Sequence, residues 1–179
     1  ALGIHLLAFP GHKGLLGPQG TGGLYIHPDV ELDELTQGGT GSNSREQDQP
    51  KERPDRYESG TPNTPGIAGL GAAVNFLAEV GLKAIEEKER ELTQRLIAGL
   101  SEIDVVTGVD ADQVSFVLDR TFGIASRPGL HCSPDAHATL GTLNTGAVRL
   151  SPGFFNELEE IDRAVEAVAA IAEEFRGRL

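Results

Sequence analysis

Residues 11–22 read GHKGLLGPQGTG and lie between two short apolar segments, residues 3–9 and residues 22–27. A stretch with five glycines and a proline does not form the interior of a helix or a strand. Residues 3–9 are typical of a short buried strand, and residues 22–27 of a second short strand. The sequence therefore predicts two strands joined by a tight, glycine-shaped connection that presents His12 and Lys13 at a fixed place.

The chain after this connection begins with a long polar loop. Residues 36–66 contain almost no apolar side chain except Tyr57, which predicts an irregular segment. Long loops of this kind are usually disordered or functional. The two ends of the loop have turn-forming sequences, whereas its centre, residues 44–54, is predicted to be mobile.

From Ile67 onward, apolar residues recur at helical spacing. The first helix is small and apolar on most faces, so we expect it to be largely buried. Strands are expected over residues 123–127 and 146–151. The last helix is expected to begin with Asn156 as N-cap and Glu159 three residues later, a capping-box pattern. The expected inward-facing side chains are Ile85, Leu92, Leu96, Leu100 and Ile103 in a second helix, Val114, Val117 and Leu118 in a third, and Ile161, Val165, Val168, Ala172 and Phe175 in the last.

Composition and charge limit the possible partners. The chain has 179 residues, with 15 Lys and Arg against 27 Asp and Glu, and a net charge of −12. Nucleic acids and anionic membranes need clustered basic residues, so we expect neither as a partner. A single cysteine excludes an intrachain disulfide and suits a reducing compartment, which favours a cytoplasmic protein. Because methionine is absent throughout, we expect a processed protein or a piece of a longer one.

Lys13 and Arg149 are candidates for polar chemistry, and each has an ordinary alternative. A lysine presented by a glycine-rich turn and partly shielded from water is suited to forming a Schiff base with a carbonyl cofactor. It is otherwise a surface lysine on a turn. Arg149 lies in a predicted strand, where it binds a carboxylate or forms a structural ion pair. Residues 38–42, GGTGS, offer backbone N–H groups to a phosphate or form an ordinary turn.

Cys132 is the third candidate. Arg127 and His131 lie nearby in the sequence and favour a thiolate, which a nucleophile requires. The alternative is a small buried apolar residue. Together with His131 and His137 it supplies three potential metal ligands, but structural zinc sites use four, usually with paired cysteines. We therefore predict no metal site.

These segments, taken together, resemble a known family. Residues 11–22, 38–42, 56–70, 127–142 and 146–156 resemble, in this order, the C-terminal half of class V pyridoxal-phosphate aminotransferases. The resemblance is greatest to cysteine desulfurases and selenocysteine lyases. It implies an α/β chain that forms the C-terminal part of a fold type I transferase. Residues 1–82 would be the end of the large mixed-sheet, cofactor-binding domain with the lysine loop, and residues 83–179 the small α+β domain with the cysteine loop.

The same resemblance implies a role for each candidate residue. Lys13 matches the lysine that holds pyridoxal 5'-phosphate and then shuttles the substrate Cα proton, and His12 matches the histidine beside it. Thr40 matches a contact to the cofactor phosphate donated across a dimer interface. Cys132 matches the cysteine that takes the substrate sulfur as a persulfide. Arg149 matches the arginine that binds the substrate carboxylate.

The implied activity is conversion of L-cysteine to L-alanine, and the implied partners are a second copy in a homodimer and a sulfur-acceptor protein. Another class V aminotransferase activity or a selenocysteine lyase stays open, because Cys132 does not separate cysteine from selenocysteine. A non-catalytic truncated fragment also stays open. The family's first half, with its phosphate-binding turn, ring-stacking residue and aspartate for the ring nitrogen, has no counterpart in this sequence.

Overall fold

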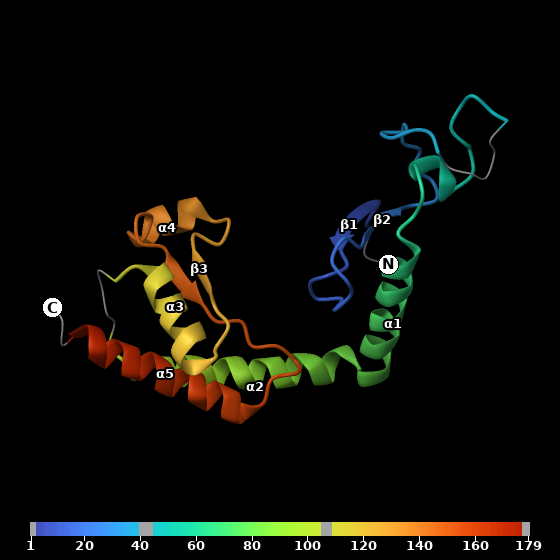
Figure 1. Cartoon of the computed structure of the whole chain (residues 1–179). Coiled ribbons are helices and arrows are strands. Elements are labelled where there is room, and N and C mark those ends of the chain that lie inside the picture. The colour runs from blue at the N-terminus through green and yellow to red at the C-terminus, as the bar shows by residue number, and fades with distance from the viewer. Residues whose placement is uncertain (1–2, 40–44, 105–108, 177–179) are drawn as a thin grey trace. The chain divides into compact units, whose positions relative to one another are not determined.

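The computed structural model describes residues 3–39, 45–104 and 109–176. The chain divides into two compact units, Ala1–Leu82 and Lys83–Leu179 (Figure 1). No single helix among the described residues is long and apolar enough to cross a membrane. One bent pair, α1 (Thr64–Val80) and α2 (Leu82–Ser101), meets that test only when its two helices are taken together.

The first unit contains the two predicted strands. Strand β1 (Leu6–Pro10) pairs antiparallel with β2 (Gly22–Ile26), and Leu6 lies opposite Ile26. A short 3₁₀ helix, η1 (Asp55–Tyr57), and helix α1 follow. Both strands are confirmed, because each is a short apolar run closed by turn-forming residues. The predicted burial of the first is wrong, since every residue of β1 is exposed, and β1 begins three residues after the predicted start.

Helix α1 begins three residues before the predicted start. The side chain of Asn63 accepts a hydrogen bond from Gly66 N at 3.1 Å, so Asn63 is the N-cap. The expected burial of this helix is wrong for the described chain. Leu77 is buried, but Ile67 is 54% exposed and Val74 is 44% exposed, because the described residues do not cover those faces.

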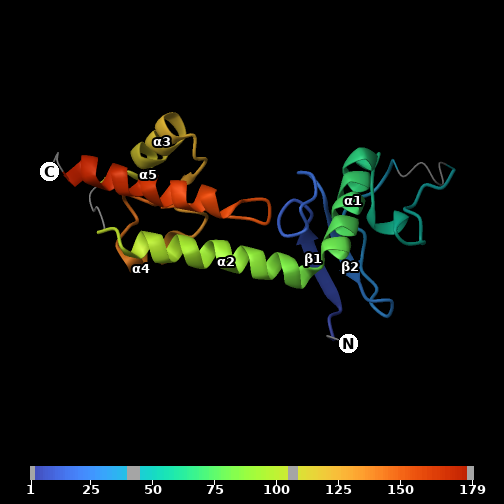
Figure 2. The ribbon, with the colours of Figure 1, turned by 90° about the horizontal axis from the view of Figure 1, so that it is seen from below.

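The second unit is built around α5 (Leu158–Arg176), which lies beside α2 (Figure 2). Leu92 and Leu96 of α2 pack against Ile161 of α5. On another side of α5, Leu118 packs against Ala167 and Ile171. The remaining elements are α3 (Ala111–Phe122), β3 (Arg127–Gly129), α4 (Pro134–Leu140) and β4 (Ala147–Arg149).

Strands β3 and β4 form an antiparallel pair in which Arg127 lies opposite Arg149. The strand predicted over residues 123–127 is therefore wrong, since β3 begins where that prediction ends. Gly123 adopts a left-handed φ of 67° and closes α3, and Ile124 N donates back to Leu118 O at 2.9 Å. These backbone groups are used by the helix end, so they are not free for a strand.

The capping pattern of the last helix is shifted by one residue from the prediction. Asn156 Oδ1 accepts from Gly153 N at 2.9 Å, which places Asn156 in a turn before the helix. The carboxylate of Glu160 accepts from Glu157 N at 3.0 Å and from Asn156 Nδ2 at 3.0 Å. The capping pair is thus Glu157 with Glu160 instead of Asn156 with Glu159.

Candidate active site

The connection between β1 and β2 closes on itself through backbone hydrogen bonds. Gly11 N donates to Thr21 O at 2.7 Å, and Gly17 N donates to Gly11 O at 2.8 Å. A tight turn follows Lys13, whose carbonyl accepts from Leu16 N at 2.9 Å. His12 and Lys13 are both exposed on this turn. The backbone therefore fixes where the lysine emerges, as the sequence predicts.

Glycines allow this loop to lie directly against α1. A Cβ at Gly17 would be 2.7 Å from Leu70 Cδ1 of α1 and 2.9 Å from Gly11 O. From the helix side, a Cβ at Gly69 would be 2.7 Å from Pro18 Cγ. Real Cβ atoms do not approach neighbours this closely, so side chains here would push the loop off the helix. Close packing against α1 is what holds the turn that carries Lys13.

The partial shielding of Lys13 expected from the sequence is not provided by the described residues, because its side chain is exposed. Four hollows on the described surface lie elsewhere, and their linings include neither His12 nor Lys13. A rigidly presented, exposed amine fits covalent attachment of a carbonyl cofactor. The described residues thus fit the attachment point of pyridoxal phosphate and do not enclose the rest of that molecule.

Thr40 lies outside the described residues, as do residues 41–44, and its phosphate contact stays a prediction. The described residues on either side meet at the base of the loop. Gly60 N donates to Gly38 O at 3.0 Å, and Gly38 N donates to Gln49 Oε1 at 3.0 Å. Gln49 Nε2 in turn donates to the carbonyls of Asp55 and Glu58, at 2.8 and 2.7 Å. One glutamine side chain therefore ties the described limbs of the loop together.

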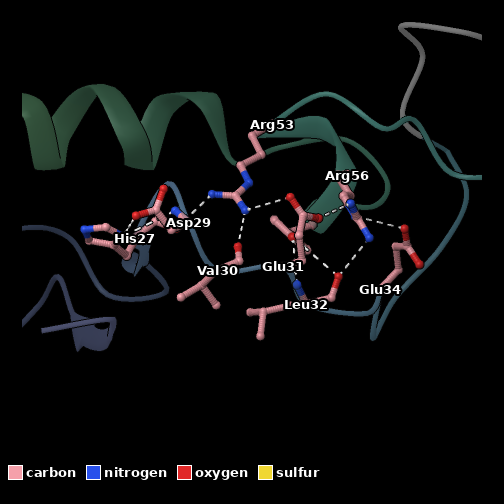
Figure 3. Close-up of polar contacts among 9 residues, drawn as sticks. His27, Asp29, Val30, Glu31, Leu32, Glu34, Arg53 and Arg56 are labelled. Atoms are coloured by element: carbon pink, nitrogen blue, oxygen red, sulfur yellow. Dashed lines mark hydrogen bonds and ion pairs between the residues drawn. The ribbon is translucent and has the colours of Figure 1, made fainter.

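Two arginines anchor the loop at the end of the segment predicted to be mobile: Arg53 lies in that segment and Arg56 just after it (Figure 3). Arg56 Nη1 lies 2.6 Å from Glu31 Oε2, and Arg56 Nε lies 3.1 Å from Glu34 Oε1. Arg53 donates to the carbonyls of His27 and Val30. We call Arg53, Arg56, Glu31 and Glu34 the arginine clamp. Sequence reasoning missed it, because charged residues about 20 positions apart carry no local signal of contact.

Cys132 lies at the tip of a turn between β3 and α4. Ser133 N donates to Leu130 O at 2.9 Å, and the two residues between them have positive φ angles, 53° at His131 and 60° at Cys132. The side chain of Cys132 is exposed. The alternative of a small buried apolar residue is therefore wrong, and the thiol is accessible to a reaction partner.

The guanidinium group of Arg127 lies beside this thiol. Arg127 Nη2 lies 3.9 Å from Cys132 Sγ, and Arg127 faces Arg149 across the β3–β4 pair. Like charges directly opposite on paired strands are unfavourable unless something offsets them. Among the described residues, no carboxylate lies within ion-pair distance of either arginine. This disfavours the structural ion pair as the role of Arg149 and leaves both groups available to an anionic ligand.

The structure thus brings together two sets of the predicted residues. His12 and Lys13 share one turn of the first unit, and Cys132 and Arg149 lie near Arg127 in the second unit. An exposed thiol beside the Arg127 guanidinium, with Arg149 on the neighbouring strand, suits a substrate that carries a carboxylate close to its sulfur atom. Sequence reasoning missed α4, although Pro134 at its first position and Gly141 after its last are the usual signals of a short helix.

Comparison with known proteins gives this arrangement a family. A sequence profile described as aminotransferase class-V matches residues 1–113. The chain belongs to the class-V aminotransferase family. This family depends on pyridoxal phosphate. Its members thus use the kind of carbonyl cofactor that the Lys13 turn suits.

Relatives within the class-V family are cysteine desulfurases. The chain is 35% identical over 194 residues to a probable cysteine desulfurase of Methanothermobacter thermautotrophicus, covering 96% of this chain and 48% of that protein. It is also 35% identical over 201 residues to probable cysteine desulfurase 2 of Mycobacterium leprae, covering 99% of this chain and 47% of that protein. The chain therefore spans about half the length of the curated relatives it matches.

Solved structures give the same result for the fold. A cysteine desulfurase from Escherichia coli superposes with a TM-score of 0.83 at 29% identity, over 96% of this chain and 47% of that one. The apo cysteine desulfurase of Thermococcus onnurineus superposes with a TM-score of 0.78 at 29% identity, over 97% and 48%. The mixed α/β fold of this class-V chain thus corresponds to about half of a cysteine desulfurase structure.

Proposed function

We propose that this chain is the C-terminal part of a pyridoxal-phosphate-dependent cysteine desulfurase, which converts L-cysteine to L-alanine and leaves a persulfide on Cys132. The observation that carries the proposal is the exposed thiol of Cys132 on its turn, with Arg127 Nη2 3.9 Å from Sγ and Arg149 on the neighbouring strand. Similarity to cysteine desulfurases over nearly the whole chain supports it.

In this proposal each side chain has one task. Arg149 binds the substrate carboxylate, and Arg127 adds a second positive charge beside it. Lys13 holds the cofactor and moves the proton at the substrate Cα, and His12 contacts the bound substrate or cofactor. When bound, pyridoxal phosphate supplies an electron sink for the substrate carbon skeleton.

The sulfur step belongs to Cys132. Its thiolate attacks the substrate sulfur, so a sulfur–sulfur bond forms and the carbon–sulfur bond breaks. The electron pair of the broken bond stays with the carbon skeleton, which leaves as alanine after taking up a proton. The net change converts cysteine and a thiol into alanine and a persulfide, and no outside oxidant is needed. Because Cys132 is exposed, an acceptor protein is the proposed next holder of the sulfur.

The remaining contacts to the cofactor are proposed to come from outside the described residues. Thr40 is proposed to reach the phosphate in the partner subunit of a homodimer, since symmetric enzymes often build sites across a two-fold axis. A complete protein that is fully active as a monomer would contradict this part of the proposal.

The test uses the protein that carries this chain, with Cys132→Ala, Cys132→Ser and Lys13→Ala as variants. Wild type should release alanine from L-cysteine and gain the mass of one sulfur atom on the Cys132 peptide. Both Cys132 variants should lose this turnover and still be labelled on Lys13 by pyridoxal phosphate and borohydride. Lys13→Ala should lose the turnover and the label. Unchanged cysteine turnover in Cys132→Ala would remove the desulfurase mechanism.

The same variants address the rival functions. Activity of Cys132→Ala on selenocysteine alone still fits a desulfurase, because selenium leaves more readily without a nucleophile. A wild-type protein that is active on selenocysteine and inactive on cysteine would favour a selenocysteine lyase. Amino-group transfer without sulfur release would favour another class-V activity. A wild-type protein with no label on Lys13 would favour a non-catalytic fragment, a reading that the chain's coverage of only half of its relatives keeps open.

A further inference from the structure

The turn that carries Cys132 has a conformation that its own residues disfavour. His131 and Cys132 are consecutive non-glycine residues with φ angles of 53° and 60°. In the left-handed region the Cβ of an L-residue crowds the carbonyl oxygen, so such residues occur there singly and seldom in pairs. Contacts outside the turn must therefore hold it in place.

The side chain of His131 provides such a contact. Its Nε2 lies 3.0 Å from the carbonyl oxygen of Ala147, at the start of β4. A carbonyl only accepts, so Nε2 carries the hydrogen and donates it. Nδ1 of the same ring is buried without a hydrogen-bond partner among the described residues. The ring thus makes one hydrogen bond, through Nε2, and lacks one at Nδ1. The bond that it makes joins the Cys132 turn to the strand that carries Arg149.

A second histidine supports the other side of the ring. The rings of His131 and His137 have centroids 5.8 Å apart and are tilted by 42°. His137 is buried, and its Nδ1 lies 2.8 Å from Thr142 Oγ1. The His131 ring is therefore held between α4 and the first residue of β4.

The backbones of Gly129 and Gly146 lie unusually close together at this end of the β3–β4 pair. A Cβ at Gly146 would lie 2.9 Å from the Cα of Gly129 and 3.2 Å from its carbonyl carbon. Backbone atoms do not move aside as flexible side chains do, so a side chain at position 146 would push the strands apart. This approach brings the Ala147 carbonyl within reach of His131.

We propose that His131 is a positioning residue, whose hydrogen bond to the Ala147 carbonyl fixes the Cys132 turn relative to the strand that carries Arg149. The inference rests on the proposed function for its consequence: the thiol is held at a set distance from a substrate whose carboxylate lies on the arginines. His131 contacts neither substrate nor cofactor in this role. It acts through the backbone of residues 130–133, and a displaced thiol would slow the attack on sulfur.

The test compares His131→Phe, which keeps a ring and loses the donor, with His131→Gln, whose amide N–H replaces Nε2–H. We expect His131→Phe to lower kcat for persulfide formation about ten- to a hundredfold, since misplacement by about 1 Å has effects of that size. KM for L-cysteine should stay within about twofold, because the arginines still bind the carboxylate. His131→Gln should recover most of the rate, whereas Gly146→Ala should reproduce the loss.

The control is Leu140→Ala, whose side chain is 73% exposed at the end of α4. It should keep the wild-type kcat and KM, and the wild-type rate of hydrogen exchange at Ser133 N–H. A His131→Phe variant with wild-type kcat, or a His131→Gln variant as slow as His131→Phe, would overturn the proposal. A larger effect on KM than on kcat would also overturn it.

Hydrogen exchange separates this inference from the proposed function. Ser133 N–H, which donates to Leu130 O, should be protected in wild type and in His131→Gln and should exchange faster in His131→Phe. Equal protection in all three would overturn the anchoring role whatever the activity. A wild-type protein that forms no persulfide would refute the proposed function, and exchange at Ser133 would still decide whether His131 holds the turn.

Discussion

Ten of the eleven buried apolar side chains among the described residues lie in the second unit, and the eleventh, Leu77, lies in the first. The first unit instead exposes large apolar side chains on both strands, such as Leu7 at 47% and Leu24 at 53%. Its contacts are mainly close glycine packing and the arginine clamp. The second unit therefore has its own hydrophobic core. The first unit has exposed apolar faces that suit packing against protein outside the described residues.

This difference also divides the chemistry. The turn that carries Lys13 is rigid but open, and the turn that carries Cys132 lies on a unit with a packed interior. Relatives twice as long as this chain are consistent with a first unit that is completed by further sequence.

The largest effect is expected for cofactor binding. The affinity of the 179 residues alone for pyridoxal phosphate should be orders of magnitude lower than that of the complete protein. The reason is that the phosphate and the ring of the cofactor lack most of their protein partners. Each charge-assisted hydrogen bond lost costs about 1.5–3 kcal/mol, and about 1.4 kcal/mol is tenfold in affinity. Absorbance titration of both proteins measures this. Micromolar, Lys13-dependent binding by the 179 residues would show that the first unit needs no cover.

Core truncation should separate the units next. Leu118 is 0% exposed, so Leu118→Ala should lower the free energy of unfolding of the second unit by about 2–5 kcal/mol. Leu24→Ala, at an exposed position of β2 in the first unit, is the matched control. It should change the free energy of unfolding of the chain by less than about 0.5 kcal/mol. Urea unfolding of the 179-residue chain followed by circular dichroism gives both values. A large loss of stability in Leu24→Ala would mean that the β1–β2 pair is covered in solution.

The arginine clamp should give a smaller and salt-dependent effect. Arg56→Ala removes contacts to two carboxylates, and partly exposed pairs of this kind contribute roughly 1 kcal/mol or less each. We expect faster proteolysis within residues 45–58 and a smaller difference from wild type at high salt. Lys51→Ala, in the same loop without an ion pair among the described residues, should cleave at the wild-type rate. Equal cleavage of Arg56→Ala and wild type would argue against the clamp.

The smallest effect concerns acid. Arg95, which hydrogen-bonds Asp162 at 2.6 and 2.7 Å, lowers the pKa of that carboxyl. A carboxyl with a lowered folded pKa adds stability above its ordinary pKa of about 4, and this stability is lost as pH falls through the lowered value. Asp162→Asn should therefore destabilise the second unit slightly at pH 7. It should have no such effect once the pH lies below the lowered pKa of Asp162.

Thermal unfolding at several pH values measures the acid effect. Glu173→Gln is the control, because Glu173 lies on the same helix without an ion pair among the described residues. It should parallel wild type across the pH range. Destabilisation by Asp162→Asn that is constant down to strongly acidic pH would contradict the assignment to this ion pair.

Local patterns were enough for part of the fold. The strands β1 and β2 and the glycine connection that carries Lys13 follow from short-range rules of apolar runs and turn residues. The inward faces of α2, α3 and α5 also follow from the helical spacing of their apolar residues, and one predicted position of each, Leu92, Leu118 and Ile161, is buried. The family resemblance was likewise carried by short motifs and is confirmed.

The candidate site was predictable in its residues and not in its arrangement. Lys13 and Cys132 could be singled out from the turns around them. The pairing of Arg127 with Arg149 depends on the register of two three-residue strands that are far apart in the sequence. The contact of His131 with Ala147 depends on the same register, and no local pattern specifies it.

The sequence by itself determined where the chain turns and which faces of its helices are apolar, because these depend on neighbouring residues only. Tertiary structure decided the start of β3, which had to follow the closure of α3 at Gly123 and match the register of β4. It also decided that Cys132 is exposed, because a left-handed turn needs contacts from α4 and β4 to hold it. Such contacts join residues that are distant in sequence, and only packing brings them together.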